Sequence, residues 1–461
     1  MEFRHRLREL RGQAGLSQRQ LAKLANYSHS YVSDLERGTR IPPVATANRL
    51  DSLLSAGGEL AALVPAAQTT HQQFDRPSRR DPVADGLQFA STWRHGVELA
   101  VGLWQWDLHR RDLLWRSGFA ASAFIGPAMR WLTAPVDERP AGTGRRPVEA
   151  PDVDTVREVT STYRALDNRY GGGHVRASVV RFLHTDVAPL LREGRYDGQI
   201  GAALLSAAAE TTQLAGWAAY DSGLHGTAQM YLIQALRLAL AAGDRPLGAE
   251  ILAAMSHQCT YLGASAEAID LARAAGRVAA DAGVEAIRAE AAVLEAQGYA
   301  VAGDERACAT ALDRAERTLD RADRGSDPQW LRYFDEAYLS AKFGHCFVAL
   351  GRGELARRFA ARSLEMNKRF VRGGQFNMAL LARAHAQVGE IEEAAVMGTQ
   401  AAQVAVGLRS ARAVDYLAAL ADRLAPHVGL PAVRDFTEQV APVLARAAGP
   451  SPGPAVLPAD R

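Results

Sequence analysis

Four polar side chains are spaced so that they would share the exposed face of one short helix: His29, Ser30, Ser33 and Asp34. Apolar Val32 and Leu35 fall on the opposite face of the same segment. Hydroxyl groups can bond to many base edges in the DNA major groove, and a carboxylate can accept a hydrogen bond from cytosine. We therefore expect a helix whose outer face can read base pairs.

The neighbouring residues predict the elements that would position this face. Ser17 and Gln20 have the spacing of a capping box, and apolar residues follow at helical spacing: Leu21, Leu24 and Ala25. Ser28 is expected to cap the next helix and Gly38 to end it. Two prolines open a further helix over residues 42–54, with its apolar stripe at Ala47, Leu50, Leu53 and Leu54. An opening helix from Phe3 to Gln13 completes a unit of four to five helices.

Residues 3 to 63 resemble the XRE/Cro-type, lambda-repressor-like DNA-binding domain. The resemblance rests on LSQ-x-x-LA, on the serine-capped second helix, and on LERG followed by proline. Carried over by position, the family's pattern places His29, Ser30, Ser33 and Asp34 near base edges. It places three other residues near phosphates, where they set register without reading sequence: Gln18, Arg37 and Arg40.

The charge of this unit, which we place at residues 1–64, is weakly positive. Nine Lys or Arg against six Asp or Glu give a net charge of +3. Phosphate contacts would then give one copy limited affinity, which favours a homodimer on a two-fold symmetric operator in double-stranded DNA. Small four-helix units also serve as dimerisation or protein-docking modules, so an adaptor that docks onto protein is the alternative.

The remaining composition excludes several classes of protein. Of 461 residues, 48% are hydrophobic and 23% charged, which is ordinary for a globular protein. The first residues lack an apolar signal core, and no run of about 18 apolar residues occurs, so we expect a cytoplasmic protein that does not contact a membrane. GxSxG and HExxH motifs do not occur. We expect no enzyme, although catalysis hidden in residues 87–200 is a remote third reading.

Cysteine and glycine motifs give no sign of a metal or phosphate site. Cys259, Cys308 and Cys346 show no CxxC pairing, and the pairs His257 with Cys259 and His345 with Cys346 each lie within one expected helix. Their spacing does not converge on a metal, so we expect core thiols and no cofactor. The glycines at 171–173 lack the strand and the Lys-Ser/Thr of a phosphate loop, which favours a flexible turn.

Composition shifts divide the rest of the chain. Residues 65–86 read as a linker, 87–200 as a helical segment with five tryptophans, 134–151 as a mobile surface loop, and 449–461 as a disordered tail. The tryptophans are Trp93, Trp104, Trp106, Trp115 and Trp131. A bulky helical core is the preferred interpretation of them, and an aromatic ligand cage is the alternative.

Five glycines mark a repeat within residues 201–448. Each is followed five positions later by a small residue: Gly223/Ala228, Gly263/Ala268, Gly303/Cys308, Gly351/Ala356 and Gly389/Ala394. The spacings of 40, 40, 48 and 38 residues predict helix-turn-helix units that stack into a solenoid. The pattern resembles the tetratricopeptide repeat (TPR) over residues 205–425, although these units are longer and most lack its terminal proline. Residues 152–200 are expected to add another helical pair, and the fold class is all-α.

Stacked first helices would line one concave wall, so residues at equal repeat positions should form a ladder there. Its members are Glu210, Gln213, Trp217, Tyr220, Glu250, His257, Glu290, Gln297, Tyr338, His345 and Arg383. They form either a solvated inner face or a groove for a peptide, a small signal or a partner helix. In the second case Arg383 could pair with a terminal carboxylate, and the glutamates could favour a cation.

The combination of an XRE-type head with a TPR-like body resembles the peptide-responsive regulators of Gram-positive bacteria and actinobacterial XRE-TPR regulators. The resemblance implies that the body binds an effector and dimerises, so that occupancy alters DNA binding.

Overall fold

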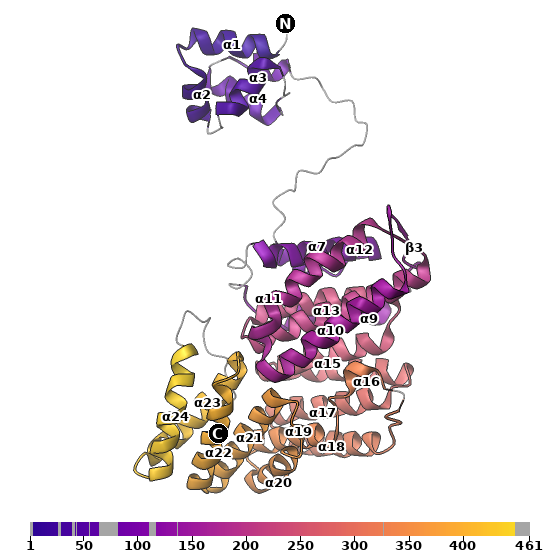
Figure 1. Ribbon diagram of the computed structural model, residues 1–461, viewed down its shortest axis with the longest axis vertical. Helices are drawn as coiled ribbons and strands as arrows, with labels where there is room; N and C mark the ends of the chain where they lie inside the picture. The colour runs from indigo at the N-terminus through magenta and orange to yellow at the C-terminus, as the bar shows by residue number, and fades with distance from the viewer. Residues whose placement is uncertain are drawn as a thin grey trace. The chain divides into compact units, whose positions relative to one another are not determined.

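The computed structural model describes residues 3–25, 29–38, 42, 44–54, 56–63, 82–109, 117–135, 137–325 and 327–447. The chain divides into two compact units, residues 1–78 and 79–461. Nearly all of the regular structure in both is helical (Figure 1). The all-α fold class expected from the sequence is therefore confirmed.

The first unit contains five short helices: α1 (Phe3–Gln13), α2 (Gln18–Ala25), α3 (His29–Arg37), α4 (Val44–Leu53) and α5 (Glu59–Ala62). The capping box forms as expected, because the Ser17 hydroxyl accepts from the Gln20 amide at 3.3 Å and the Gln20 side chain accepts from the Ser17 amide at 2.8 Å. Gly38 ends α3 with a φ of +74°. Fully buried Val32 and Leu35 hold α3 to the core.

Two leucines expected in this core are exposed. Leu24 is 56% exposed and Leu53 is 39% exposed, whereas Ala22 is buried in α2. In α2 the buried side chains span about 100° of the helix surface, from Leu21 to Ala22, and Leu24 lies about 60° outside that arc. The sequence therefore predicted the helical period of α2 correctly but placed the centre of its buried face at the wrong residues.

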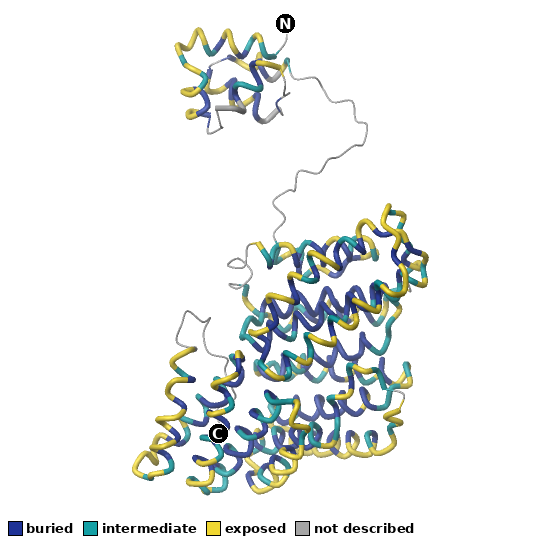
Figure 2. The backbone as a smooth tube through the Cα atoms, viewed as in Figure 1, coloured by how far each residue is buried: buried dark blue, intermediate teal, exposed yellow. Residues whose placement is uncertain are grey.

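The second unit begins with helices packed on α14 (His225–Ala242). They are α6 (Pro82–Leu87), α7 (Trp93–His109) and α9 (Ile125–Thr133), which follows a 3₁₀ turn at Ala121–Phe124. The Gln234 side chain of α14 donates to the carbonyls of Gly86 and Gln88 at 2.9 Å. The predicted linker, residues 65–86, therefore extends too far, because the chain is helical and packed on α14 from residue 82. Because these helices cover its outer face, α14 is buried along nearly its whole length. Figure 2 shows that buried residues are concentrated in the middle of this unit.

The tryptophans of this region belong to the core. Trp104 and Trp131 are almost wholly buried, and Trp93 and Trp106 pack against the same cluster. Trp115 lies outside the described residues. The expected mobile loop at 134–151 instead contains two strands of a small sheet, β1 (Gly142–Thr143) and β2 (Arg146–Pro147). Both pair with β3 (Gly194–Tyr196), β1 antiparallel and β2 parallel.

A helical pair joined by a short bend precedes the repeats. It consists of α10 (Ala150–Tyr170) and α11 (Gly172–Phe182), and a π-helical turn (Leu183–Val187) leads on to α12 (Ala188–Glu193). The three glycines at the bend are not a flexible turn. A Cβ at Gly172 would lie 2.5 Å from the Ala218 carbonyl oxygen, and one at Gly171 would lie 2.8 Å from that of Arg409. Only glycine allows this close packing.

Six antiparallel helix pairs follow, and their packing fits a solenoid. They are α13 (Gly198–Asp221) with α14, α15 (Arg245–Tyr261) with α16 (Ser265–Asp281), α17 (Glu285–Ala302) with α18 (Glu305–Leu319), α19 (Glu336–Ala349) with α20 (Gly353–Ser363), α21 (Val371–Val388) with α22 (Ile391–Ala405), and α23 (Ala411–Leu424) with α24 (Pro431–Ala447). All five turn glycines have a positive φ, and all five small residues after them are fully buried. Gly243 and Gly283 also have a positive φ and end the second helices, so glycine recurs every 20 residues from 223 to 303.

The last helices return to the first pair. The Arg409 amide donates to the Tyr170 carbonyl at 2.8 Å, and the Gly173 amide donates to the Arg409 carbonyl at 2.9 Å. The Tyr261 hydroxyl donates to Asp415 at 2.6 Å, which ties α15 to α23. The expected concave groove is therefore covered at one side by α10, α21 and α23.

Candidate functional site

The outer face of α3 carries the first candidate site. The Arg37 side chain is 61% exposed and lies 2.5 Å from Asp34, whose side chain is 33% exposed. Ser33 is half-buried. The side chains of His29 and Ser30, and all of Arg40, lie outside the described residues. An ion pair between exposed side chains is weak. Arg37 and Asp34 can therefore separate and bind groups of a nucleic acid instead.

Gln18 has a different partner from the expected phosphate. Its amide donates to the buried carboxylate of Glu36 at 2.8 Å, and Arg11 donates to the same carboxylate at 2.5 Å. Burial raises the pKa of Glu36, but the hydrogen bonds from Arg11 and Gln18 outweigh it and lower that pKa below its usual value. Gln18 therefore helps to fix α3 against α1 and α2. No local pattern identifies Glu36 as a buried carboxylate, because its partners Arg11 and Gln18 lie 25 and 18 positions away in the sequence.

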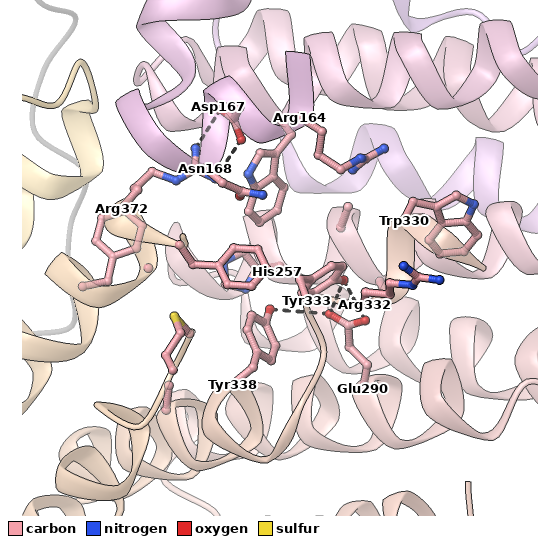
Figure 3. A pocket seen from close by; sticks show the side chains of 18 of the residues that line it. Arg164, Asp167, Asn168, His257, Glu290, Trp330, Arg332, Tyr333, Tyr338 and Arg372 are labelled. Atoms are coloured by element: carbon pink, nitrogen blue, oxygen red, sulfur yellow. Dashed lines mark hydrogen bonds and ion pairs between the residues drawn. The ribbon is translucent and has the colours of Figure 1, made fainter. Parts of the chain in front are cut away.

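A cavity of about 360 Å³ in the second unit is the other candidate site. Its lining comes from α10, α13, α15, α17, α19, α21 and α23, and from the segments 329–333 and 366–370 (Figure 3). Eight ladder residues line it: Gln213, Trp217, Glu250, His257, Glu290, Gln297, Tyr338 and His345. Glu210, Tyr220 and Arg383 do not. Glu210 pairs with Arg164 at 3.0 Å, and Tyr220 is buried behind the wall.

At one end of the cavity two carboxylates share a hydroxyl group. The Tyr333 oxygen lies 2.8 Å from Glu250 Oε1 and 2.8 Å from Glu290 Oε1. One hydroxyl has one proton, so only one contact can be a donation from tyrosine, and the other requires a protonated carboxyl group. Burial and the neighbouring Glu290 raise the pKa of Glu250 well above its usual value, which assigns the extra proton to Glu250. These glutamates thus carry one negative charge between them, which weakens the expected attraction for a cation.

At the other end three basic side chains meet. Lys342 Nζ lies 2.8 Å from His257 Nδ1, and an Arg412 nitrogen lies 3.5 Å from His257 Nε2. Burial, followed by the nearby Lys342 and Arg412, lowers the pKa of His257 well below its usual value, so the imidazole is neutral at pH 7. Four aromatic rings surround the Arg412 guanidinium at 4.5 to 5.9 Å: Tyr220, Phe376, Tyr261 and Trp217.

A buried ionic network closes the wall behind this basic end. Arg372 binds Asp167 through two hydrogen bonds of 2.9 and 2.8 Å, and it lies 3.2 Å from Asp221. Asp221 also accepts hydrogen bonds from the Ser410 hydroxyl and the Gly172 amide. Because these five residues come from distant parts of the chain, the network joins the first helical pair to the last ones.

Sequence reasoning missed several of the charged residues at this site. The charged ones are Arg164, Asp167, Lys342, Arg372 and Arg412, and the polar Tyr333 was missed with them. Two signals were available. The spacing of 48 residues between Gly303 and Gly351 marks an insertion, and that insertion supplies Tyr333 to the cavity. Lys342 is one of only three lysines in a chain with 53 basic residues.

Other site types find no support in the part of the chain that the structure describes. Within those ranges no three His, Cys, Asp or Glu side chains gather as a metal site. All three cysteines are buried free thiols. None of the described helices has the length and apolar character needed to cross a bilayer.

Comparison with known proteins bears on the first unit alone. The chain has no match among curated proteins. Residues 2–64 match the family model of a helix-turn-helix domain, which together with the packing of α2 and α3 identifies the first unit as a helix-turn-helix domain and indicates a DNA-binding regulator.

Proposed function

We propose that the chain is an XRE-type transcriptional regulator whose TPR-like helical unit binds an effector and whose occupancy controls DNA binding. The cavity carries this proposal. A space of about 360 Å³ with both charged and aromatic walls has the size and mixed lining of small-molecule sites. The proposed role of these polar groups is binding, and we propose no catalytic step.

The effector must act through a difference in affinity. It changes DNA binding only if it binds the DNA-competent and incompetent geometries unequally. The weakly basic first unit favours two copies on one operator, so we also propose that the chain dimerises and that occupancy alters the spacing of two DNA-binding units. Size measurement by light scattering in solution tests the dimer.

Selection of genomic fragments by the full-length protein tests the function itself. We expect enrichment of a site with two-fold symmetry and an affinity that falls steeply with salt. Failure to bind any duplex, at low salt and with or without cell extract, would refute the regulator and favour the adaptor that docks onto protein.

Two substitutions in α3 test the assignment of the readers. Arg37→Ala should weaken binding to all sequences about equally, because a phosphate contact carries no sequence information. Ser30→Ala should change the preference at one base position. Arg317→Ala is the control, since Arg317 is 64% exposed on the helical unit. Parallel losses on every sequence from both α3 variants would contradict the assignment.

A further inference from the structure

The basic end of the cavity has more cationic groups than anionic partners. Lys342 and Arg412 are both buried and flank the same imidazole ring, that of His257. Among the described residues no carboxylate lies within ion-pair distance of Lys342, and Arg412 reaches only Asp221, at 3.9 Å. Asp221 is already bound by Arg372, Ser410 and Gly172, as described above.

Buried charges are normally paired, because leaving water costs a lone ion several kcal/mol. The other carboxylates of the lining cannot supply the missing charge. Asp167 is held by Arg372, Glu250 carries the extra proton, and Glu290 accepts the hydrogen bond of the Tyr333 hydroxyl. Burial, partly offset by Glu290, lowers the pKa of Lys342 to about 7. A bound anion would offset this desolvation and keep the ammonium protonated.

The walls next to this cluster are aromatic. The Trp217 ring stacks on His257 with centroids 5.5 Å apart and planes 27° from parallel. Phe376 and Tyr416 line the same region and contact each other. Flat rings on such walls favour a ligand with a flat apolar body.

The polar groups at the far end set the length of this ligand. Glu250 precedes His257 by seven residues on α15, which is about 10 Å along a helix axis. Glu250 Oε2 is buried and has no hydrogen-bond partner among the described residues. A hydroxyl group at that distance from the anionic head would satisfy it.

Charge favours a singly charged ligand over a doubly charged one. A dianion at the basic end would also face the carboxylates of Asp167 and Glu290 across the cavity.

Building on the proposed function, we propose that the cavity binds a small hydroxyaromatic carboxylic acid as its monoanion. The carboxylate lies between Lys342 and Arg412, the ring lies against Trp217 and Phe376, and the hydroxyl group points toward Glu250. This assignment replaces the peptide and cation alternatives that the sequence left open.

The probe is 6-hydroxy-2-naphthoate, tested on the full chain without DNA by calorimetry and thermal shift. Its primary amide has the same shape and no charge. We expect the acid to bind at least about tenfold more tightly than the amide. Lys342→Met should reduce this preference several-fold, because Arg412 alone remains to bind the carboxylate, and should leave amide affinity unchanged, so amide binding reports that the variant is folded. The matched control Lys368→Met alters an exposed lysine outside the lining and should retain the preference.

Equal affinity for acid and amide, no binding of the acid, or a preference that Lys342→Met leaves undiminished would each overturn the assignment. Naphthoate without the hydroxyl group should bind more weakly than the hydroxy acid. Inorganic phosphate at equal concentration should not displace the acid, and displacement would mean a site for any anion and overturn the aromatic ligand. The proposed function is tested by a different measurement. A protein that binds the acid but binds no operator would refute the regulator and leave the ligand assignment standing.

Discussion

The two units place their functional side chains in opposite ways. In the helix-turn-helix domain the candidate readers follow one another within residues 29–37 of one helix, where the Arg37 side chain is exposed and that of Asp34 is partly exposed. In the helical unit the cavity gathers residues from 161 to 416, and most of its charged side chains are buried, among them Lys342, Arg372 and Arg412. Local sequence therefore specifies the first site, whereas the second depends on how the last helices return to the first.

This difference predicts where each unit is sensitive to substitution. An exposed site tolerates the loss of one side chain, because water replaces the missing partner. A buried network does not, because the remaining charge has no water to solvate it. The largest effects should therefore come from the network that closes the cavity.

Arg372→Met should have the largest effect. It leaves Asp167 and Asp221 buried without their shared cation, and breaking a buried pair costs about 3–5 kcal/mol of unfolding free energy. Tryptophan fluorescence measures this directly in denaturant, since all seven tryptophans lie between residues 93 and 330 and none is in the first unit.

Arg362→Met, an exposed arginine nearby, is the control and should change the unfolding free energy by less than about 1 kcal/mol. Similar costs from both substitutions would remove the contrast between buried and exposed charge. An equal loss of hydrogen-exchange protection in the first unit would show that the units are not independent.

Sequence patterns predicted the helices of both units well and their charged contacts poorly. Caps, turn glycines and apolar periodicity are local, so Ser17, Gly38 and the five repeat glycines were identified correctly. The exposed positions of Leu24 and Leu53 were missed, because the period alone does not fix the centre of a helix's buried face.

The second prediction concerns Glu36, the buried carboxylate of the first unit that pairs with Arg11. Arg11→Met should cost about 3 kcal/mol, because the buried Glu36 carboxylate keeps its charge and loses its closest partner, which leaves Gln18 at 2.8 Å and Arg8 at 3.6 Å. Amide hydrogen exchange in α2 and α3 should accelerate, and DNA affinity should fall. The tryptophan transition of the helical unit should not move.

The pH dependence of this effect tests its cause. The folded pKa of Glu36 is lowered, so its pairing stabilises the fold above the unfolded pKa of about 4.5 and is lost as the pH falls through the folded value. The difference between wild type and Arg11→Met should therefore be full at pH 7 and shrink below about pH 4. A constant difference across that range would mean that lost packing, not lost charge, is responsible.

The cavity could be predicted only in part. Equal repeat positions located eight lining residues, since stacking carries local register from one pair to the next. The return of α21 and α23 to α10 depends on Asp167 meeting Arg372, residues 205 positions apart, and no local pattern connects them. The contact between Arg412 and His257 also joins residues far apart in the sequence. Because the repeat pattern does not reveal such contacts, the sequence predicted an open groove where the structure has a covered cavity.

The smallest effect tests whether the repeats are as locally determined as the helix-turn-helix domain. Gly303 has a φ of +78° and Gly374 lies within α21, and a Cβ at either would meet no other atom within 4 Å. Gly303→Ala should lower the unfolding free energy by about 1 kcal/mol, because a Cβ atom disfavours the left-handed backbone conformation that Gly303 adopts. Gly374→Ala adds the same methyl group and should stabilise by about 0.5–1 kcal/mol, because it lowers the entropy lost on folding. Opposite signs in denaturant unfolding would show that backbone conformation alone fixes this turn, and equal signs would mean that contacts between pairs dominate even there.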